Sequence, residues 1–321
     1  MSIRKKTLLI IISTLVILVG VLWGTAQSLV MGSFDKLEQR DAIKNTNRAQ
    51  SALNQVLADM DTKASDWSAW DDTYNFVKDG NKGFVNSNIT ESAFSGMKLN
   101  TIIIIDTAGK IIYGQGFDST TKKISPLPSD MQSHLVSTDP ILQHSSPNDS
   151  HAGILMLKDG PLMLASRPIV NSSGKGPIRG SLIFARFLNA DEVARLSDLT
   201  HLSLSVFPAN DLTGLSTDQQ VICKNLAPTK ASVCPVDNKI IVGYSLSDDL
   251  YKKPAVVLSV NIPREIHTYG LAAMKYLLTS LALAVILFAV VMVLVIDRLV
   301  LVRIAQLNKF AHGALQQLGI E

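Results

Sequence analysis

The chain has 321 residues, of which 47% are hydrophobic and 18% charged, with a formal net charge of +3. The length allows about two ordinary domains, and so small and dispersed a charge argues against a nucleic-acid partner. The apolar excess is concentrated near the two ends, which indicates a membrane protein.

Two uncharged apolar runs carry this excess. They extend from Leu8 to Met31 and from Tyr276 to Ile296, and each is about one bilayer long as a helix. We predict transmembrane helices at residues 7–31 and 275–297. A cleaved signal peptide is an alternative for the first run, because Gly24-Thr25-Ala26 imitates a cleavage site.

The flanking charges predict the orientation. Basic residues precede the first run and follow the second, and the segment between them opens with few cations. The positive-inside rule then places both termini in the cytoplasm and the middle of the chain outside the inner (plasma) membrane. The cytoplasmic tail is residues 1–6, and the basic residues are Arg4, Lys5, Lys6, Arg298, Arg303 and Lys309.

A helical pattern follows the first span. From Phe34 to about Phe76 apolar residues recur at spacings of three and four, and no proline occurs before Pro126. We predict a stem helix that continues out of the membrane, with residues 32–60 as its own segment, and that stops before Gly80.

The pattern then becomes extended. Hairpins are expected in "NTIIIIDTAGKIIYGQG" and "HAGILMLKDGPLMLASRPIV", with a fifth strand in "IRGSLIFARFL". Between the hairpins lies a polar insertion with a short amphipathic helix from Ser129 to Val136. Residues 61–190 therefore form a five-stranded antiparallel sheet capped by the stem helix.

Residues 191–272 form a second, smaller α/β subdomain next to the membrane. Asn189 caps a short helix, and strands are expected at 202–207, 239–245 and 255–261. Cys223 and Cys234 fall here, on one loop. Extracytoplasmic cysteines tend to pair, so we predict a disulfide, with two free thiols as the alternative. The predicted fold class is α+β.

The segment "SDWSAWDDTYNF" holds the candidate ligand-binding residues. On one continuous helix Trp67, Trp70, Asp71 and Tyr74 share a face. Burying an unpaired Asp71 carboxylate is costly, so we expect it to meet a cation, N–H donors or a ligand. Two interpretations stay open: an aromatic core with Asp71 paired inside the protein, or a pocket whose rings form the walls while Asp71 holds a polar or cationic group.

Arg167 is a cation in an otherwise apolar strand, in "LASRPIV". It can pair with Asp71, bind an anionic ligand, or point to solvent from the outer face of the sheet.

Enzymatic signatures are absent from the sequence. There is no HExxH, GxSxG or GxxxxGK[ST] motif. The six histidines show no metal-ligand spacing, so no metal site and no cofactor are expected. We therefore do not expect this chain to be an enzyme.

The runs "DWSAWDDTYNF", "LNTIIIIDTAGKIIYGQGFD" and "GPLMLASRPIV…GPIRGSLIFARFL" resemble the fourth class of CHASE sensor domains over roughly residues 61–188. That resemblance implies an extracytoplasmic module with a PAS/Cache-like fold, which precedes a cytoplasmic cyclase, phosphodiesterase or histidine kinase. Residues 298–321 are similar to the start of a HAMP linker, although Arg303-Ile304 stands where such linkers carry a proline.

We therefore expect a transmembrane sensory receptor that binds a small molecule outside and passes a conformational change to a cytoplasmic signalling partner or an output domain missing from this chain. The alternative is a membrane-anchored envelope protein that binds another protein and no small molecule. A homodimer is expected, although the polar first half of the stem shows no clean heptad seam.

Overall fold

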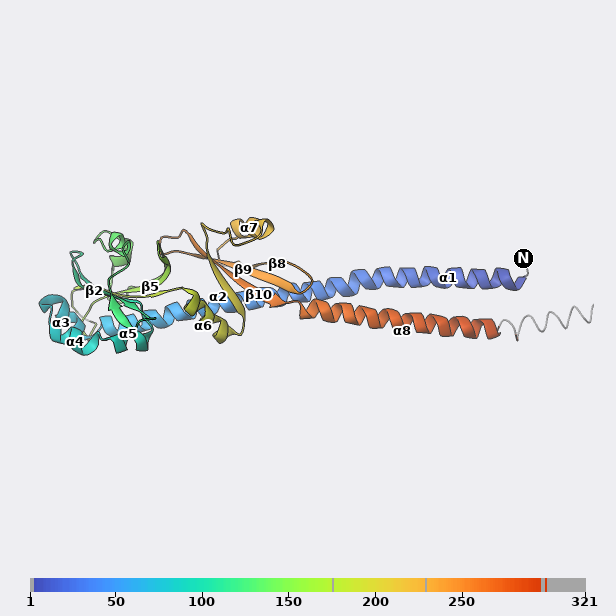
Figure 1. Ribbon diagram of the computed structural model, residues 1–321, viewed down its shortest axis with the longest axis horizontal. Coiled ribbons are helices and arrows are strands. Elements are labelled where there is room, and N and C mark those ends of the chain that lie inside the picture. Colours follow the sequence, from blue (N-terminus) through green and yellow to red (C-terminus); the bar gives the residue numbers. More distant parts are fainter. Residues whose placement is uncertain (1–2, 175, 229, 296–297, 299–321) are drawn as a thin grey trace, which may run out of the picture. The chain divides into compact units, whose positions relative to one another are not determined.

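The computed structural model describes residues 3–174, 176–228, 230–295 and 298 (Figure 1). The chain divides into two compact units. We call Met1–Arg40 with Arg264–Glu321 the helical unit, and Asp41–Pro263 the sheet unit.

The helical unit contains the two apolar helices. The first runs without interruption through α1 (Ile3–Ala26), the π-helical turn η1 (Gln27–Met31) and the beginning of α2 (Gly32–Ser68). The second is α8 (Glu265–Val295), which packs beside α1 and η1. Both are long and apolar enough to cross a membrane, and none of their most apolar stretches is buried. Full exposure is unlike the core helix of a soluble domain.

The larger sheet of the sheet unit is antiparallel and has the strand order β3-β2-β1-β6-β5-β4. Five of its strands follow the predicted hairpins and the fifth-strand prediction, and β3 adds a short edge strand from the polar insertion. The strands are β1 (Thr101–Asp106), β2 (Ile111–Asp118), β3 (Lys123–Ser125), β4 (His151–Leu157), β5 (Gly160–Pro168) and β6 (Gly180–Phe187).

The four consecutive isoleucines of β1 show that this sheet is covered on both faces. Ile102 and Ile104 belong to the core that α2 shares, whereas Ile103 and Ile105 belong to a second core beneath the polar insertion. Successive strand residues point to opposite faces, so a strand without polar alternation needs a cover on each side. The insertion supplies one cover through two 3-10 turns, η2 (Met131–His134) and η3 (Pro140–Leu142). The short helix predicted at 129–136 is thus only a 3-10 turn.

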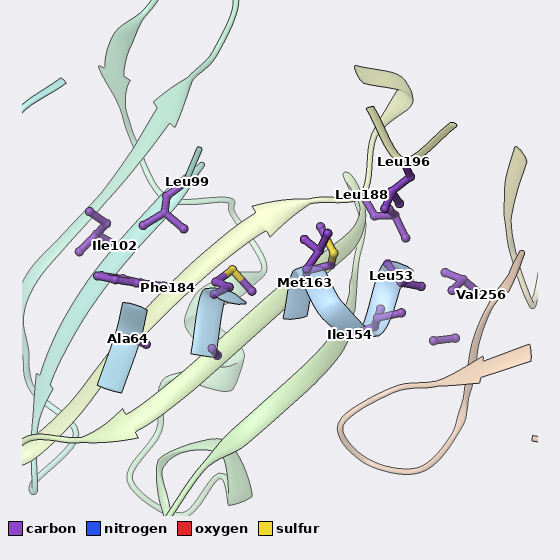
Figure 2. Packing of buried hydrophobic residues seen from close by; sticks show 14 of the residues in the cluster. Leu53, Ala64, Leu99, Ile102, Ile154, Met163, Phe184, Leu188, Leu196 and Val256 are labelled. Atoms are coloured by element: carbon purple, nitrogen blue, oxygen red, sulfur yellow. The ribbon is translucent and has the colours of Figure 1, made fainter. Parts of the chain in front are cut away.

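Helix α2 supplies the other cover. Figure 2 shows Leu53 and Ala64 of α2 among Ile154, Met163 and Phe184 of the sheet, all nearly inaccessible to solvent. The amphipathic half of the predicted stem therefore buries its apolar face on the sheet.

A smaller antiparallel sheet follows, with the order β7-β10-β9-β8. Three of its strands and α6 correspond to predicted elements, while α7 and β8 were not predicted. Gly243 lets α2 approach this sheet, because a Cβ built on Gly243 would lie 1.8 Å from the Thr46 hydroxyl. The elements are α6 (Ala190–Thr200), β7 (Ser203–Pro208), α7 (Thr217–Lys224), β8 (Ser232–Pro235), β9 (Ile240–Asp248) and β10 (Pro254–Pro263).

The predicted fold class, a long N-terminal helix on antiparallel sheets with two candidate membrane helices, is confirmed. The end of the stem was predicted wrongly. Helix α2 ends at Ser68, Trp70 is extended (φ −103°, ψ 133°), and a separate helix α3 (Asp71–Asp79) begins at Asp71. Two further short helices follow, α4 (Lys82–Asn88) and α5 (Glu91–Met97).

Tertiary hydrogen bonds explain this break. The Val170 N–H donates to the Ser68 carbonyl (3.0 Å), and Asp71 and Ser172 bond reciprocally through backbone N–H groups and side chains. These bonds satisfy backbone groups that a continuous helix would have paired within itself. The sequence has no glycine or proline between Ser68 and Asp71, so no local pattern predicts the break.

Candidate functional site

The aromatic residues around the end of α2 form one chain of ring contacts. Trp67 meets Phe184 of β6 edge-on with centroids 5.6 Å apart, and meets Trp70 at 6.4 Å. Trp70 in turn lies 6.0 Å from Phe84 of α4. Trp67 is therefore part of the packing between α2 and the sheet, whereas Trp70 continues toward α3 and α4 and keeps 37% of its surface exposed.

Tyr74 has a structural partner. The Arg179 guanidinium carbon lies 3.6 Å from the centroid of the Tyr74 ring, and Arg179 also donates to the Tyr74 carbonyl (2.8 Å). The Tyr74 hydroxyl donates to the Pro177 carbonyl (3.3 Å). These contacts hold the loop before β6 on α3, and they occupy both the face and the hydroxyl of the ring.

Asp71 is exposed, which differs from the expected buried carboxylate. Its carboxylate accepts the Ser172 N–H (2.9 Å), and its own N–H donates to the Ser172 hydroxyl (3.1 Å). The Ser172 backbone bond, followed by its side chain, holds the pKa of Asp71 below the ordinary value. The four candidates do not share one helical face, because the helix that would have aligned them ends at Ser68.

A surface cavity of about 510 Å³ lies beside Trp70, and we call it the Trp70 cavity. Its aromatic residues are Trp70, Phe76 and Phe84, and its polar residues include Asp72 and Asp79. Among the described residues no lysine or arginine lines it. The full lining is Trp70, Asp72, Asn75, Phe76, Asp79, Asn81, Gly83, Phe84, Ser87 and Asn88.

The loop between α3 and α4 is shaped by its own side chains. Asp79 accepts the Asn81 N–H (3.0 Å), and Asn81 accepts the Gly83 N–H (2.8 Å) as the N-cap of α4. Gly80 takes the left-handed conformation (φ 60°) that ends α3. Asp72, in contrast, makes no hydrogen bond or ion pair within the described part of the chain, so its carboxylate is available to a solute in the cavity.

Arg167 pairs with Asp61 of α2, and not with Asp71. Its Nε donates to one Asp61 oxygen (2.6 Å) and its Nη2 to the other, and the two side chains are only 18% and 17% exposed. The Ser150 hydroxyl adds a third bond to Asp61 (2.7 Å). This bidentate pair links α2 to β5.

A second cavity, of about 290 Å³, lies between α5 and α6 and contains Arg186, Glu192 and Arg195. These charges already satisfy one another, with Arg186 and Arg195 bonded to Glu192 at 3.1 and 2.5 Å. Burial, the largest influence, raises the pKa of Glu192, but Arg195 and Arg186 outweigh it and leave the pKa below the ordinary value. Arg186 also donates to the Lys98 and Met97 carbonyls, so the group is held by internal hydrogen bonds and fixes α6 in place.

The sequence profile of the CHASE4 domain matches residues 52–207, which include α3, α4, the whole larger sheet and the Trp70 cavity. This chain carries a CHASE4 sensor domain.

A curated relative shares more of the chain than this domain. Methanogenesis regulatory histidine kinase FilI of Methanothrix harundinacea (strain 6Ac) is 27% identical over 292 residues, which are 90% of this chain and 32% of FilI. The chain therefore spans about a third of the length of that relative.

Solved structures share the fold. The extracellular domain of vpHK1S-Z8, a predicted histidine kinase, superposes with a TM-score of 0.50 at 12% identity, covering 74% of this chain and 95% of that one. The periplasmic domain of Vibrio cholerae LuxQ reaches a TM-score of 0.45 at 10% identity, covering 69% and 99%. At 12% identity, the superposition on vpHK1S-Z8 shows a shared fold and nothing about ligands.

The CHASE4 domain also contains a cluster that sequence reasoning missed. His144, Asp149 and His151 lie together at the start of β4, although the histidines were interpreted as scattered. The spacing H-x4-D-x-H was visible in the sequence, but only the loop that folds back before β4 brings the three side chains together.

Outside the CHASE4 domain, the two cysteines are not on one loop as predicted. Cys223 is buried on α7 and Cys234 is half-buried on β8, and both are free thiols in the structure. A disulfide between them stays a prediction. Burial raises the pKa of Cys223 to about 11.

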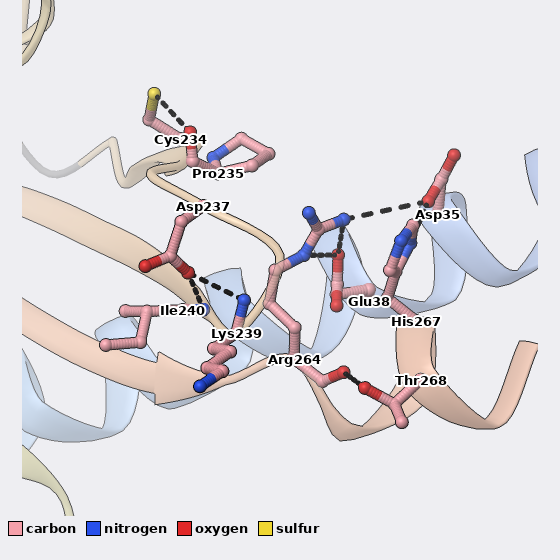
Figure 3. Close-up of polar contacts among 10 residues, drawn as sticks. All are labelled: Asp35, Glu38, Cys234, Pro235, Asp237, Lys239, Ile240, Arg264, His267 and Thr268. Atoms are coloured by element: carbon pink, nitrogen blue, oxygen red, sulfur yellow. Dashed lines mark hydrogen bonds and ion pairs between the residues drawn. The ribbon is translucent and has the colours of Figure 1, made fainter. Parts of the chain in front are cut away.

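The helical unit has an ion-pair group of its own, shown in Figure 3. Arg264, just before α8, donates to Glu38 of α2 through Nε (3.0 Å) and Nη2 (2.8 Å), and only 4% of Glu38 and 9% of Arg264 is exposed. The His267 Nδ1 atom lies 3.2 Å from the Asp35 Oδ1 atom. This group joins the beginning of α2 to the beginning of α8. The predicted HAMP-like linker, beyond Arg298, lies outside the described residues.

Proposed function

We propose that this chain is the input part of a transmembrane receptor, with both termini in the cytoplasm and the CHASE4 domain outside. The domain binds a small molecule, and the two membrane helices pass a conformational change to a cytoplasmic output such as a histidine kinase, cyclase or phosphodiesterase. Its similarity to part of FilI supports an output of the kinase class. We further propose that the receptor is a homodimer, as expected from the sequence.

The observation that carries the ligand proposal is the composition of the Trp70 cavity. Three aromatic residues stand beside two carboxylates, and the described lining has no basic side chain to neutralise them. A small organic cation gains from both features, since ring faces attract cations and carboxylates attract them by charge. Of the five residues predicted from the sequence, Trp70 lines this cavity, and the proposal assigns it direct contact with the ligand. The other four, Trp67, Asp71, Tyr74 and Arg167, are not in the lining.

The position of this cavity suggests how binding is transmitted. Trp70 is two residues beyond the end of α2. A cation that binds against the Trp70 ring can therefore change the position of that helix. Helix α2 continues without interruption to η1 and α1, and Glu38 on α2 is paired with Arg264 before α8. A ligand that favours one position of α2 thereby changes how often the two membrane helices adopt each of their relative positions.

The test uses the full chain in lipid nanodiscs and two isosteric solutes, choline and its uncharged analogue 3,3-dimethyl-1-butanol. At about 100 times its dissociation constant, choline should raise the Tm of the sheet unit by roughly 5–10 °C. The neutral analogue should leave the Tm unchanged, because it fills the same space without charge.

The matched variants are Asp72→Asn in the cavity and Asp66→Asn on the exposed side of α2. Asp72→Asn should remove the choline shift while Asp66→Asn retains it. Equal responses to choline and to its neutral analogue, or a shift that survives Asp72→Asn, would refute the cationic site. A domain that instead copurifies with one envelope protein and answers to no solute would favour the anchored interaction protein.

A further inference from the structure

Two histidines and one aspartate at the start of β4 form a compact group of potential metal ligands. One ligand atom each from His144, Asp149 and His151 lies within 4.8 Å of the other two. The two imidazole rings stack with their centroids 4.9 Å apart and their planes at 26°. All three side chains are half-buried, which shields the group from bulk water.

Hydrogen bonds orient both imidazoles. The Nε2 of His151 lies 2.9 Å from the Gln143 carbonyl, which can only accept, so this nitrogen carries the proton and the neutral ring keeps its lone pair on Nδ1. The Nε2 of His144 bonds the Ser166 hydroxyl at 3.2 Å. Metal-binding histidines usually have the second ring nitrogen held in this way.

The Nδ1 atom of His144 has no hydrogen-bond partner among the described residues, although it is buried. Buried polar atoms nearly always have a partner, so such an atom calls for an explanation. The neighbouring ring of His151 and the carboxylate of Asp149 are the polar groups closest to supplying one. A metal ion shared by the three would satisfy this nitrogen.

Hydrogen bonds hold the Asp149 carboxylate in place. One of its oxygens accepts the Ser145 N–H (2.8 Å) and hydroxyl (3.0 Å), and the other accepts the Ser150 N–H (3.1 Å). Each carboxylate oxygen has more than one lone pair, so these bonds leave capacity for a metal.

We propose that His144, Asp149 and His151 form a binding site for a divalent transition-metal ion of the zinc class. Two imidazoles and one carboxylate suit Zn²⁺, whereas Mg²⁺ and Ca²⁺ prefer oxygen ligands alone. Ligand atoms of a tetrahedral zinc site lie about 3.4 Å apart, so a small rotation of the side chains closes the group. Three protein ligands leave the fourth position to water or another ligand.

The site is connected to helix α2. Ser150, which lies between two of the ligands, donates its hydroxyl to Asp61 (2.7 Å), and the Asp149 carbonyl accepts from Arg167 (3.5 Å). An ion that fixes this loop therefore also fixes the contacts that hold α2 on the sheet. This inference does not depend on the ligand proposed for the Trp70 cavity.

The experiment is calorimetric titration of Zn²⁺ into the full chain, purified without a histidine tag, in nanodiscs at neutral pH. We expect one Zn²⁺ bound through this site, and a tetrahedral visible spectrum when Co²⁺ replaces it. His144→Ala and His151→Ala should each weaken Zn²⁺ binding more than about tenfold. The exposed His201, replaced as His201→Asn, is the matched control and should bind Zn²⁺ like the wild type.

A second group, Asp35, Glu38 and His267, could also attract a metal ion, and His267→Ala separates the two. The proposal is overturned if His267→Ala alone abolishes binding, if both His144→Ala and His151→Ala bind as the wild type does, or if equimolar Mg²⁺ displaces Zn²⁺. Circular dichroism shows whether a variant is folded. If His144→Ala is not folded, the size-matched Asp149→Asn is used in its place. Asp149→Asn should weaken Zn²⁺ binding by the same factor, and Zn²⁺ binding like that of the wild type would be the contrary result.

Discussion

The pair between Asp61 on α2 and Arg167 on β5 offers the sharpest test of how the stem helix is held on the sensor sheet. We predict that Asp61→Asn destabilises the sheet unit by about 2–3 kcal/mol. Breaking a fully buried pair costs about 3–5 kcal/mol and an exposed pair less than about 1. The two side chains are 17% and 18% exposed, so the pair lies nearer the buried limit.

The assay is denaturant unfolding followed by tryptophan fluorescence. The chain has three tryptophans, and Trp23→Phe leaves only Trp67 and Trp70, which report on the end of α2. At about 2–4 °C per kcal/mol for a unit of this size, the same change should lower the Tm by roughly 4–12 °C. Asp66→Asn, on the exposed side of the same helix, should change stability by less than about 0.5 kcal/mol.

A double-mutant cycle isolates the pair itself. Arg167→Gln should also destabilise, and the double variant should lose at least about 1 kcal/mol less than the sum of the two single changes. Additive losses, or an Asp61→Asn variant as stable as Asp66→Asn, would show that α2 is held by apolar packing alone.

Three further predictions concern other parts of the chain. Cys234 should react with iodoacetamide at pH 8. Cys223, whose pKa is raised to about 11, should react only as the pH approaches that value and its thiolate forms. If neither thiol is labelled before reduction, the predicted disulfide exists. Gly243→Ala should destabilise the sheet unit by roughly 1–3 kcal/mol, because the new Cβ would clash with Thr46. Adding Thr46→Ala should partly restore the thermal stability. A double variant as unstable as Gly243→Ala would contradict this contact. Glu38→Gln removes the nearer carboxylate from the buried Arg264 guanidinium and leaves it the Asp35 carboxylate at 3.9 Å. Hydrogen exchange should therefore speed up in residues 264–270, and unchanged protection would argue against a junction at this pair.

Much of the fold could be predicted because its signals are local. The two uncharged runs, the Asp-Gly turn of the second hairpin and the four isoleucines of β1 each specify their element without reference to the rest of the chain. Even so, Cys223 and Cys234 were placed on a loop, since the capping box at Ser216 and Gln219 that starts α7 went unrecognised.

The candidate site was predictable only in composition. The aromatic segment was singled out from its composition, but the shared face of Trp67, Trp70 and Tyr74 assumed a continuous helix. Hydrogen bonds from Val170 and Ser172, about one hundred residues away in sequence, end that helix and bring Asp71 to the surface. Contacts between residues so far apart leave no periodic pattern in the sequence.

The same limit applied to the charged groups. Arg167 was recognised as out of place in its strand, yet its partner Asp61 lies 106 residues away. His144 and His151 are only seven residues apart, but the intervening loop has to turn back before their rings meet. The sequence identified Arg167 as unusual but not its partner, and it did not identify the histidine cluster, because both arrangements depend on tertiary structure.

The central claim is that the CHASE4 domain passes ligand binding to the membrane helices. Double electron–electron resonance tests it directly, by measuring the distance between spin labels at exposed Val21 on α1 and exposed Leu277 on α8. The protein is in nanodiscs, and both native cysteines are replaced by serine. We predict that choline changes the distance distribution, that 3,3-dimethyl-1-butanol does not, and that Asp72→Asn abolishes the change. A distribution that stays the same while choline is bound would contradict the account.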